Sequence, residues 1–118
     1  MLEKSVIRQF RMIGRDMFLR GLVGSHAGNM SVRIDDKIYI TRTGSMLGRL
    51  AESDIIKVHL DKDDENTAKA SSELVVHRAI YRNTVALSVV HAHPPYATTL
   101  SMIRDELVPI DTEGGHCF

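Results

Sequence analysis

One stretch of this 118-residue chain limits its possible folds more than any other. Leu87–Val90 is a short apolar run with β-branched residues, which predicts a buried strand. Pro94 and Pro95 have no backbone N–H to donate, so the strand has to stop there. His91 and His93 therefore lie at the C-terminal end of a strand, which is where α/β folds place their chemistry.

The spacing of these two histidines predicts a metal site. Side chains alternate along a strand, so His91 and His93 are expected on the same face, about 6.6 Å apart at their Cα atoms. Two imidazoles at that spacing can bind one cation. We expect Zn²⁺, with another divalent metal as the alternative. Taken alone, a His-x-His pair is better explained as two strand-end histidines that make ordinary hydrogen bonds.

Composition and charge exclude several classes of partner. Lysine plus arginine and aspartate plus glutamate number 15 each, so no overall field attracts nucleic acid or an anionic membrane. No apolar stretch is long enough to cross a bilayer, and the N-terminus leads into an amphipathic segment. The single cysteine, Cys117, fits a reducing compartment. We therefore expect one cytoplasmic domain, residues 1–118, with any anionic ligand bound at a local site.

Hydrophobic periodicity predicts a mixture of helices and strands. Helices are expected at 5–22, 74–83 and 96–103. Strands are expected at 30–34, 37–41, 55–60, 87–90 and 107–110. The first two strands form a hairpin around two consecutive aspartates, and 61–70 is expected to be a charged, exposed loop.

Three turns between these elements are rich in small or hydroxyl-bearing residues. In 24–31, Gly28 can adopt positive φ, and the amides together with the Asn29 side chain can hold an anion. The second turn is Thr43–Ser45. The third, Ser71–Ser72, precedes a predicted helix, where serine is a good N-cap and free N–H groups favour phosphate. Taken alone, the first turn is better explained as a plain helix-to-strand loop, and the other two are also explained as a tight turn and a helix cap.

Three titratable side chains lie in or next to these turns. Glu73 is expected in the first turn of its helix, where the dipole favours a carboxylate, so taken alone it needs no catalytic role. His77 is one helical turn further on, and we expect it to pack against its neighbours. His26 is expected at the surface or behind the site.

Four motifs, taken together and in order, resemble the class II aldolase/adducin family. They are Gly28–Ser31, Thr43–Ser45, Ser71–Glu73 and His91–Pro94. The resemblance covers nearly the whole chain, from the first helix to Gly114. It implies a three-layer α/β/α sandwich around a mostly antiparallel sheet, with the C-terminal part of the fold missing from these 118 residues. It also implies a homo-oligomer, usually a tetramer, with active sites between subunits.

The same resemblance implies roles for individual residues. Glu73 would be the general base, and His91 and His93 would be two zinc ligands. The substrate phosphate would be held by Gly28, Asn29, Thr43, Gly44, Ser71 and Ser72.

The implied reaction is reversible aldol cleavage of a phosphorylated ketose. Zinc stabilises an enediolate as a Lewis acid, Glu73 moves the proton, and remote phosphate binding fixes the reacting carbons. A sugar-phosphate dehydratase and a pentulose-phosphate 4-epimerase are alternatives on the same scaffold. A non-catalytic adducin-like assembly domain is a further alternative, which the presence of Glu73, His91 and His93 disfavours.

Two departures from the family pattern lie near the C-terminus. The family's third zinc histidine belongs to a segment beyond Phe118, and His116 lies in a glycine-rich tail that matches no zinc motif, so we expect it not to replace that ligand. One branch of the family's aldolases uses a tyrosine after the strand at 107–110, where this chain has none. Glu113 is either the acid at that place, as in the family's dehydratases, or a surface turn residue.

Overall fold

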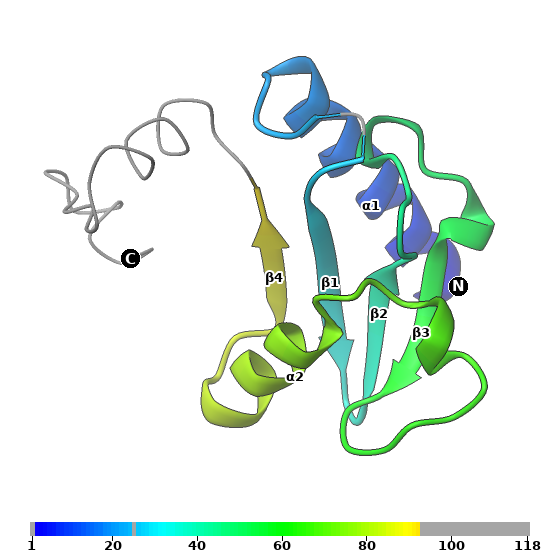
Figure 1. Cartoon of the computed structure of the whole chain (residues 1–118), viewed down its shortest axis with the longest axis vertical. Coiled ribbons are helices and arrows are strands. Elements are labelled where there is room, and N and C mark those ends of the chain that lie inside the picture. The colour runs from blue at the N-terminus through cyan, green and yellow to red at the C-terminus, as the bar shows by residue number, and fades with distance from the viewer. Residues whose placement is uncertain (1, 25, 93–118) are drawn as a thin grey trace, which may run out of the picture.

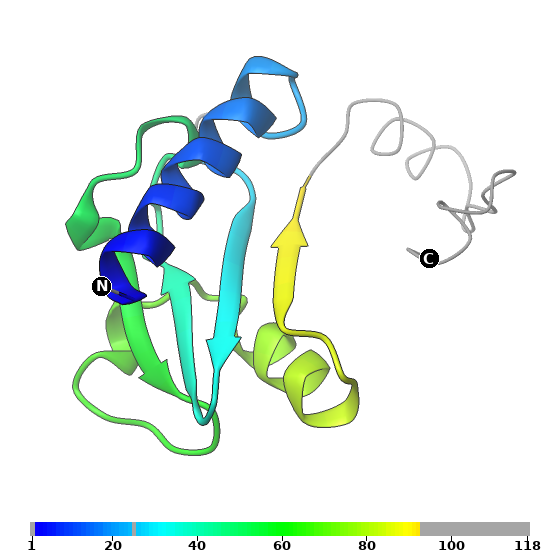
Figure 2. The same cartoon turned by 180° about the vertical axis from the view of Figure 1, so that it is seen from behind.

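The computed structural model describes residues 2–24 and 26–92. This part of the chain forms a four-stranded antiparallel sheet of order β3-β2-β1-β4, with one helix on each face (Figure 1, Figure 2). The helices and strands are α1 (Leu2–Leu19), β1 (Asn29–Ile34), β2 (Lys37–Thr41), β3 (Ile55–His59), α2 (Leu74–Asn83) and β4 (Ser88–His91). Short 3₁₀ helices cover Leu47–Arg49, Glu52–Asp54 and Thr67–Lys69.

Helix α1 begins and ends earlier than the predicted range 5–22. Its end is set by a Schellman motif, in which Gly21 adopts a φ of 73°. The Gly21 N–H bonds to the Phe18 carbonyl at 3.1 Å, and the Leu22 N–H bonds to the Met17 carbonyl at 2.9 Å. Apolar spacing continues past this point, but the hydrogen bonds turn the chain away from the helix axis.

The predicted hairpin and third strand are confirmed to within one residue. β1 and β2 pair from Ile34 opposite Lys37 to Ser31 opposite Ile40. The two-residue loop between them places Asp35 at a φ of 55°, which aspartate tolerates better than most residues. β3 pairs along the other edge of β2.

The core lies in two layers, one on each face of the sheet. Ile38 and Ile40 of β2 are fully buried on the α2 side, together with Tyr81 of α2. Tyr39, between them in sequence, packs on the α1 side with Phe10. This alternation follows from the period of two along a strand, and it holds both helices against one sheet.

Strand β4 differs from the prediction of a buried strand at 87–90. It runs over Ser88–His91 and pairs with β1, and in the described part of the chain it has no partner on its other edge. Leu87 is 67% exposed and Val90 is 49% exposed. An apolar run indicates a strand but does not reveal how many of its faces and edges are covered, because that depends on distant segments.

Two further expectations concern the loops and the C-terminal region. The predicted loop 61–70 is mostly exposed, but it contains one 3₁₀ turn and ends at the buried Ala70. The predictions for 96–103 and 107–110, and those for His93, Glu113 and His116, fall outside the described residues. Over the described ranges, no helix combines the length and apolar character needed to cross a membrane.

Candidate active site

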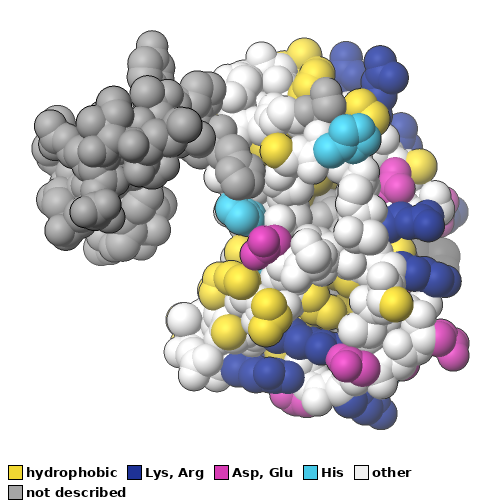
Figure 3. Space-filling view, in the orientation of Figure 1, with side chains coloured by type: hydrophobic (Ala, Val, Ile, Leu, Met, Phe, Trp, Pro, Cys, Tyr) yellow, Lys and Arg dark blue, Asp and Glu magenta, His cyan; other side chains and the backbone are white. Residues whose placement is uncertain are grey.

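A polar cavity of about 220 Å³ forms where the predicted motifs meet. It includes every predicted phosphate-binding residue, the predicted base Glu73 and the predicted metal ligand His91. Its lining consists of His26, Ala27, Gly28, Asn29, Arg42, Thr43, Gly44, Ser45, Ser71, Ser72, Glu73 and His91. Acidic and basic side chains are interspersed on the α2 side of the molecule, so no field of one sign dominates there (Figure 3). Any anion selectivity must therefore come from the cavity itself.

The antiparallel order of the strands brings these motifs together. β1 begins where its neighbours β2 and β4 end, so Asn29 lies directly opposite His91. The chain leaving β2 is joined to the start of α2 by two backbone hydrogen bonds. The Thr43 N–H donates to the Lys69 carbonyl at 3.0 Å, and the Ser71 N–H donates to the Thr41 carbonyl at 2.9 Å. Residues far apart in sequence thus share one end of the sheet.

Gly28 is required by the close packing of the first turn. Its φ is 92°, a conformation that glycine adopts readily and other residues rarely do. A Cβ atom at this position would lie 2.6 Å from Val23 Cγ1 and 3.0 Å from the His91 carbonyl oxygen. The turn can therefore approach β4 only because residue 28 has no side chain.

The start of α2 differs from the predicted serine cap. Glu73 occupies the N-cap position, and its own side chain makes no capping hydrogen bond. Ser71 instead accepts the Glu73 N–H with its hydroxyl oxygen, at 3.2 Å. Within residues 2–24 and 26–92 the half-buried Glu73 carboxylate makes no hydrogen bond or ion pair, so it is available to a ligand in the cavity.

Arg42 is a lining residue that the sequence reasoning did not single out. It directly precedes the Thr43–Ser45 turn, and its exposed side chain has no acidic partner among the described residues. A cation immediately before a hydroxyl-rich turn was the available signal. His26, expected at the surface or behind the site, is exposed and also lines the cavity. Its Nδ1–H donates to the Gly44 carbonyl at 2.9 Å and so links the first turn to the second.

Beneath the cavity lies a buried histidine. His77 packs against its neighbours, as expected, and is 1% exposed. Burial lowers its pKa to about 4, with a further lowering from His91 and an opposing effect from Glu73, so the ring is neutral near pH 7. Its two ring nitrogens are both hydrogen-bonded, Nδ1 to the Ser31 hydroxyl at 2.6 Å and Nε2 to the Asn29 carboxamide.

His91 and Glu73 supply an imidazole and a carboxylate to the same cavity, and both are ligand types that zinc accepts. The donor chemistry therefore fits a divalent cation. The Asn29 carboxamide contacts His91 Nδ1 at 3.3 Å. His93, the second predicted ligand, lies outside the described residues, and in the part of the chain that is described no three suitable side chains come together.

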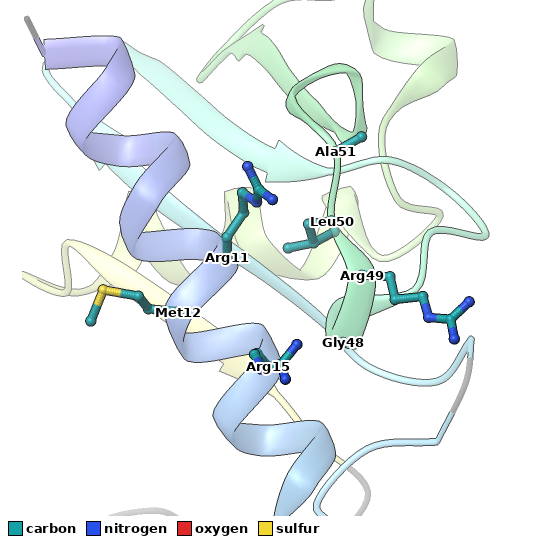
Figure 4. A pocket seen from close by; sticks show the side chains of 7 residues that line it. All are labelled: Arg11, Met12, Arg15, Gly48, Arg49, Leu50 and Ala51. Atoms are coloured by element: carbon teal, nitrogen blue, oxygen red, sulfur yellow. The ribbon is translucent and has the colours of Figure 1, made fainter.

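A larger cavity of about 580 Å³ lies between α1 and the first 3₁₀ helix (Figure 4). Its lining consists of Arg11, Met12, Arg15, Gly48, Arg49, Leu50 and Ala51. Arginine keeps its charge throughout the physiological pH range and is not a metal ligand, so these residues can neither exchange protons nor hold a cation. The smaller polar cavity is therefore the candidate site.

Comparisons with known proteins agree with the resemblance seen in the motifs. The L-fuculose phosphate aldolase of Methanocaldococcus jannaschii is 39% identical over 108 residues, covering 91% of this chain and 59% of that protein. The methylthioribulose-1-phosphate dehydratase of Gluconobacter oxydans is 40% identical over 98 residues, covering 80% of this chain and 47% of that protein. The chain spans about half the length of these relatives.

The fold comparison gives the same result. The crystal structure of L-fuculose-1-phosphate aldolase from Thermus thermophilus matches with a TM-score of 0.83 and 40% identity, covering 97% of this chain and 60% of that one. Residues 8–118 match the family described as Class II Aldolase and Adducin N-terminal domain. Relatives at similar identity are named as aldolases, decarboxylases and dehydratases. The chain therefore belongs to the class II aldolase and adducin family.

Proposed function

We propose that this chain carries the phosphate-binding and acid–base part of an active site that cleaves a phosphorylated ketose by an aldol reaction. One observation supports this above the others. A single polar cavity combines three hydrogen-bonding turns, an uncommitted carboxylate and a histidine at a strand end. The proposal concerns the activity of the whole protein. This chain covers 59% of the length of the M. jannaschii relative.

The phosphate would bind to the turns and the N-terminus of α2. Thr43, Ser71 and Ser72 contribute hydroxyl groups, and Asn29 contributes a carboxamide. The N-terminus of a helix has free N–H groups and the positive end of its dipole, both of which favour an anion. Arg42 adds a full positive charge at the same cavity. This combination favours a phosphate group over an uncharged sugar.

The proton transfer falls to Glu73. Its carboxylate is half-buried at the cavity, next to the proposed phosphate site and unused by capping. A phosphate held by the turns fixes the rest of the substrate relative to the Glu73 oxygens, so proton removal occurs within one complex. Glu73 therefore acts as the general base in this scheme.

A divalent cation, for which we propose Zn²⁺, supplies Lewis-acid stabilisation of negative charge on a substrate oxygen when it is bound. His91 would hold it, with His93 as the second ligand of the proposed set. The role of the chain's own groups is to present an imidazole nitrogen beside the carboxylate of Glu73.

We also propose that the described sheet and helices belong to a complete three-layer α/β/α sandwich, in a cytoplasmic homo-oligomer that is a tetramer in the simplest case. Within the described residues β4 has no partner on its outer edge, and Val90 in this strand and Leu87 just before it are exposed, which supports further structure packing there.

A dehydratase is the second candidate function, because the named dehydratase is as similar to this chain as the named aldolase is. Incubating the protein with Zn²⁺ and a panel of ketose 1-phosphates, followed by NMR of the products, separates the two. Aldol cleavage gives two carbonyl fragments, whereas dehydration gives one product and water. Detection of a dehydrated product alone would replace the aldolase assignment.

The variant Glu73→Gln tests the proposed base. It should reduce turnover by about 10²–10⁴-fold, the usual contribution of a positioned acid or base, and leave binding of inorganic phosphate nearly unchanged. Glu65→Gln, in the exposed loop, is the matched control and should behave as wild type. Full activity of Glu73→Gln would show that Glu73 only begins the helix.

A further inference from the structure

Three arginine side chains line the larger cavity, which lies between α1 and the first 3₁₀ helix (Figure 4). Arg11 and Arg15 come from α1, and Arg49 comes from the facing 3₁₀ helix. All three are exposed, and their side chains make no hydrogen bond or ion pair with any residue in the described part of the chain. This arginine cavity, named after Arg11, Arg15 and Arg49, is therefore a local excess of unpaired positive charge in a chain with no net charge. The basic side chains that do form ion pairs among the described residues are Lys57, His59, Arg78 and Arg82.

Close backbone packing forms the walls of the arginine cavity. A Cβ atom at Gly14 of α1 would overlap the Leu47 carbonyl oxygen, and one at Gly48 would lie 2.7 Å from Phe18 Cγ. The first 3₁₀ helix can therefore lie against α1 only because both positions lack a side chain. Since Arg49 directly follows Gly48, this contact also fixes the backbone that carries Arg49 relative to α1. The cavity is thus a property of the fold, and the backbone positions of its three arginines are set by two packed elements.

The charges around the arginine cavity are unfavourable to one another unless an anion is present. Arg11 and Arg15 are four residues apart on one face of α1, a spacing at which like charges repel. Glu52 lines the neighbouring groove together with Arg11, but it forms no ion pair with any described residue. A guanidinium group offers a planar fork of N–H donors that matches the oxygens of a phosphate or carboxylate group. An anion of that kind would satisfy these donors and offset the repulsion at the same time.

We propose that the arginine cavity binds a small organic anion with two or more phosphate or carboxylate groups. Three guanidinium groups exceed the charge of any single phosphate or carboxylate group, so a ligand with several such groups matches them best. The volume of about 580 Å³ is typical of a small-molecule site, and Met12 and Leu50 offer apolar surface to a carbon skeleton. The lining shares no residue with the candidate active site, so this second site is independent of the proposed aldol reaction.

A titration of the 118-residue chain with pyrophosphate and, separately, with citrate, followed by ¹H–¹⁵N NMR, locates the bound anion. We expect at least one of the two to bind saturably with one-to-one stoichiometry and to shift the Nε–H signals of Arg11, Arg15 and Arg49. Both anions carry about three negative charges near pH 7.5, so the tighter one identifies the preferred anionic group. The absence of saturable shifts with both anions would overturn the proposal, and so would shifts confined to Ser71 and Ser72 of the candidate active site.

The variants Arg15→Gln and Arg49→Gln test one arginine from each wall of the cavity. Glutamine keeps a polar side chain but removes the charge, so each variant should weaken binding of the tighter anion about tenfold, the effect of losing one charge-assisted hydrogen bond. Arg20→Gln is the matched control and should keep the wild-type affinity. Arg20 is exposed and unpaired among the described residues, like the other two arginines, but it lies outside the cavity lining.

Two outcomes of the variant series contradict the proposal. Wild-type affinity in a folded Arg15→Gln/Arg49→Gln double variant would show that these arginines do not bind the anion. An equal loss of affinity in Arg20→Gln would show a general attraction to positive charge in place of a site. Both measurements follow binding alone, so their results do not depend on whether the proposed aldol reaction is found.

Discussion

The buried His77 predicts a pH dependence of stability that can be isolated from the rest of the protein. Its pKa is about 4 in the folded chain, against an ordinary value of 6.5. At pH values between these two pKa values, the histidine is mostly protonated in the unfolded chain and mostly neutral in the folded chain. The stabilising contribution is therefore complete above pH 6.5 and is lost as the pH falls toward 4.

The magnitude follows from the two pKa values. Each pKa unit corresponds to about 1.36 kcal/mol, so the full effect is about 3 kcal/mol. Relative to about pH 7.5, proton linkage lowers the free energy of unfolding by about 1.3 kcal/mol at about pH 5.5 and by about 2.5 kcal/mol at about pH 4.5. This is a large share of the ~5–15 kcal/mol typical of a small domain.

Urea denaturation of wild type and His77→Gln at pH 7.5, 6.5, 5.5 and 4.5 measures the effect. Other titrating groups are shared, so they largely cancel in the difference between the two unfolding free energies. That difference should favour the wild type most at pH 7.5 and shift by about 2–3 kcal/mol toward the variant at pH 4.5. A difference that stays constant from pH 7.5 to 4.5 would refute the argument that burial controls the charge of His77.

Two further substitutions test the packing around the site and the edge of the sheet. Gly28→Ala places a Cβ 2.6 Å from Val23 Cγ1 in a backbone with a φ of 92°. It should lower the free energy of unfolding, measured by urea denaturation, by about 2–4 kcal/mol, and an unchanged midpoint would contradict the close approach. Val90→Thr changes a side chain that is 49% exposed on β4, so it should alter the unfolding free energy by less than about 0.5 kcal/mol, whereas a loss above about 2 kcal/mol would show that the strand is covered.

Local chemistry was sufficient to predict most of the described elements. The aspartate turn between two β-branched runs predicted the β1–β2 hairpin, and apolar spacing predicted α1 and α2. Two of the errors lie at helix ends. α1 stops at Leu19 because Gly21 allows a Schellman motif. At the start of α2, Glu73 occupies the N-cap position, and the Ser71 hydroxyl oxygen accepts the Glu73 backbone N–H. Both helix ends depend on which backbone N–H and C=O groups are hydrogen-bonded, and hydrophobic periodicity carries no information about this.

The members of the site were predicted from their motifs, and their meeting at one cavity was established by the strand order. Asn29 and His91 are 62 residues apart, yet they lie opposite each other because β4 pairs antiparallel with β1. Arg42 directly precedes a recognised motif and was missed, because its only signal was its position before a hydroxyl-rich turn. The predicted roles of Glu73 and His91 stay predictions, and the Glu73→Gln variant tests the first of them.

The sequence by itself determined the family, the order of the elements and the residue types gathered at the end of the sheet. Those properties depend on local spacing and on motifs that are continuous in the chain. Only the tertiary structure decided that β4, within the described residues, has an open edge and that His77 is linked to Ser31 and Asn29, 46 and 48 residues away. The physical reason is that burial and hydrogen-bond satisfaction are set by what packs against a group, and a helical pattern shows only which way that group faces.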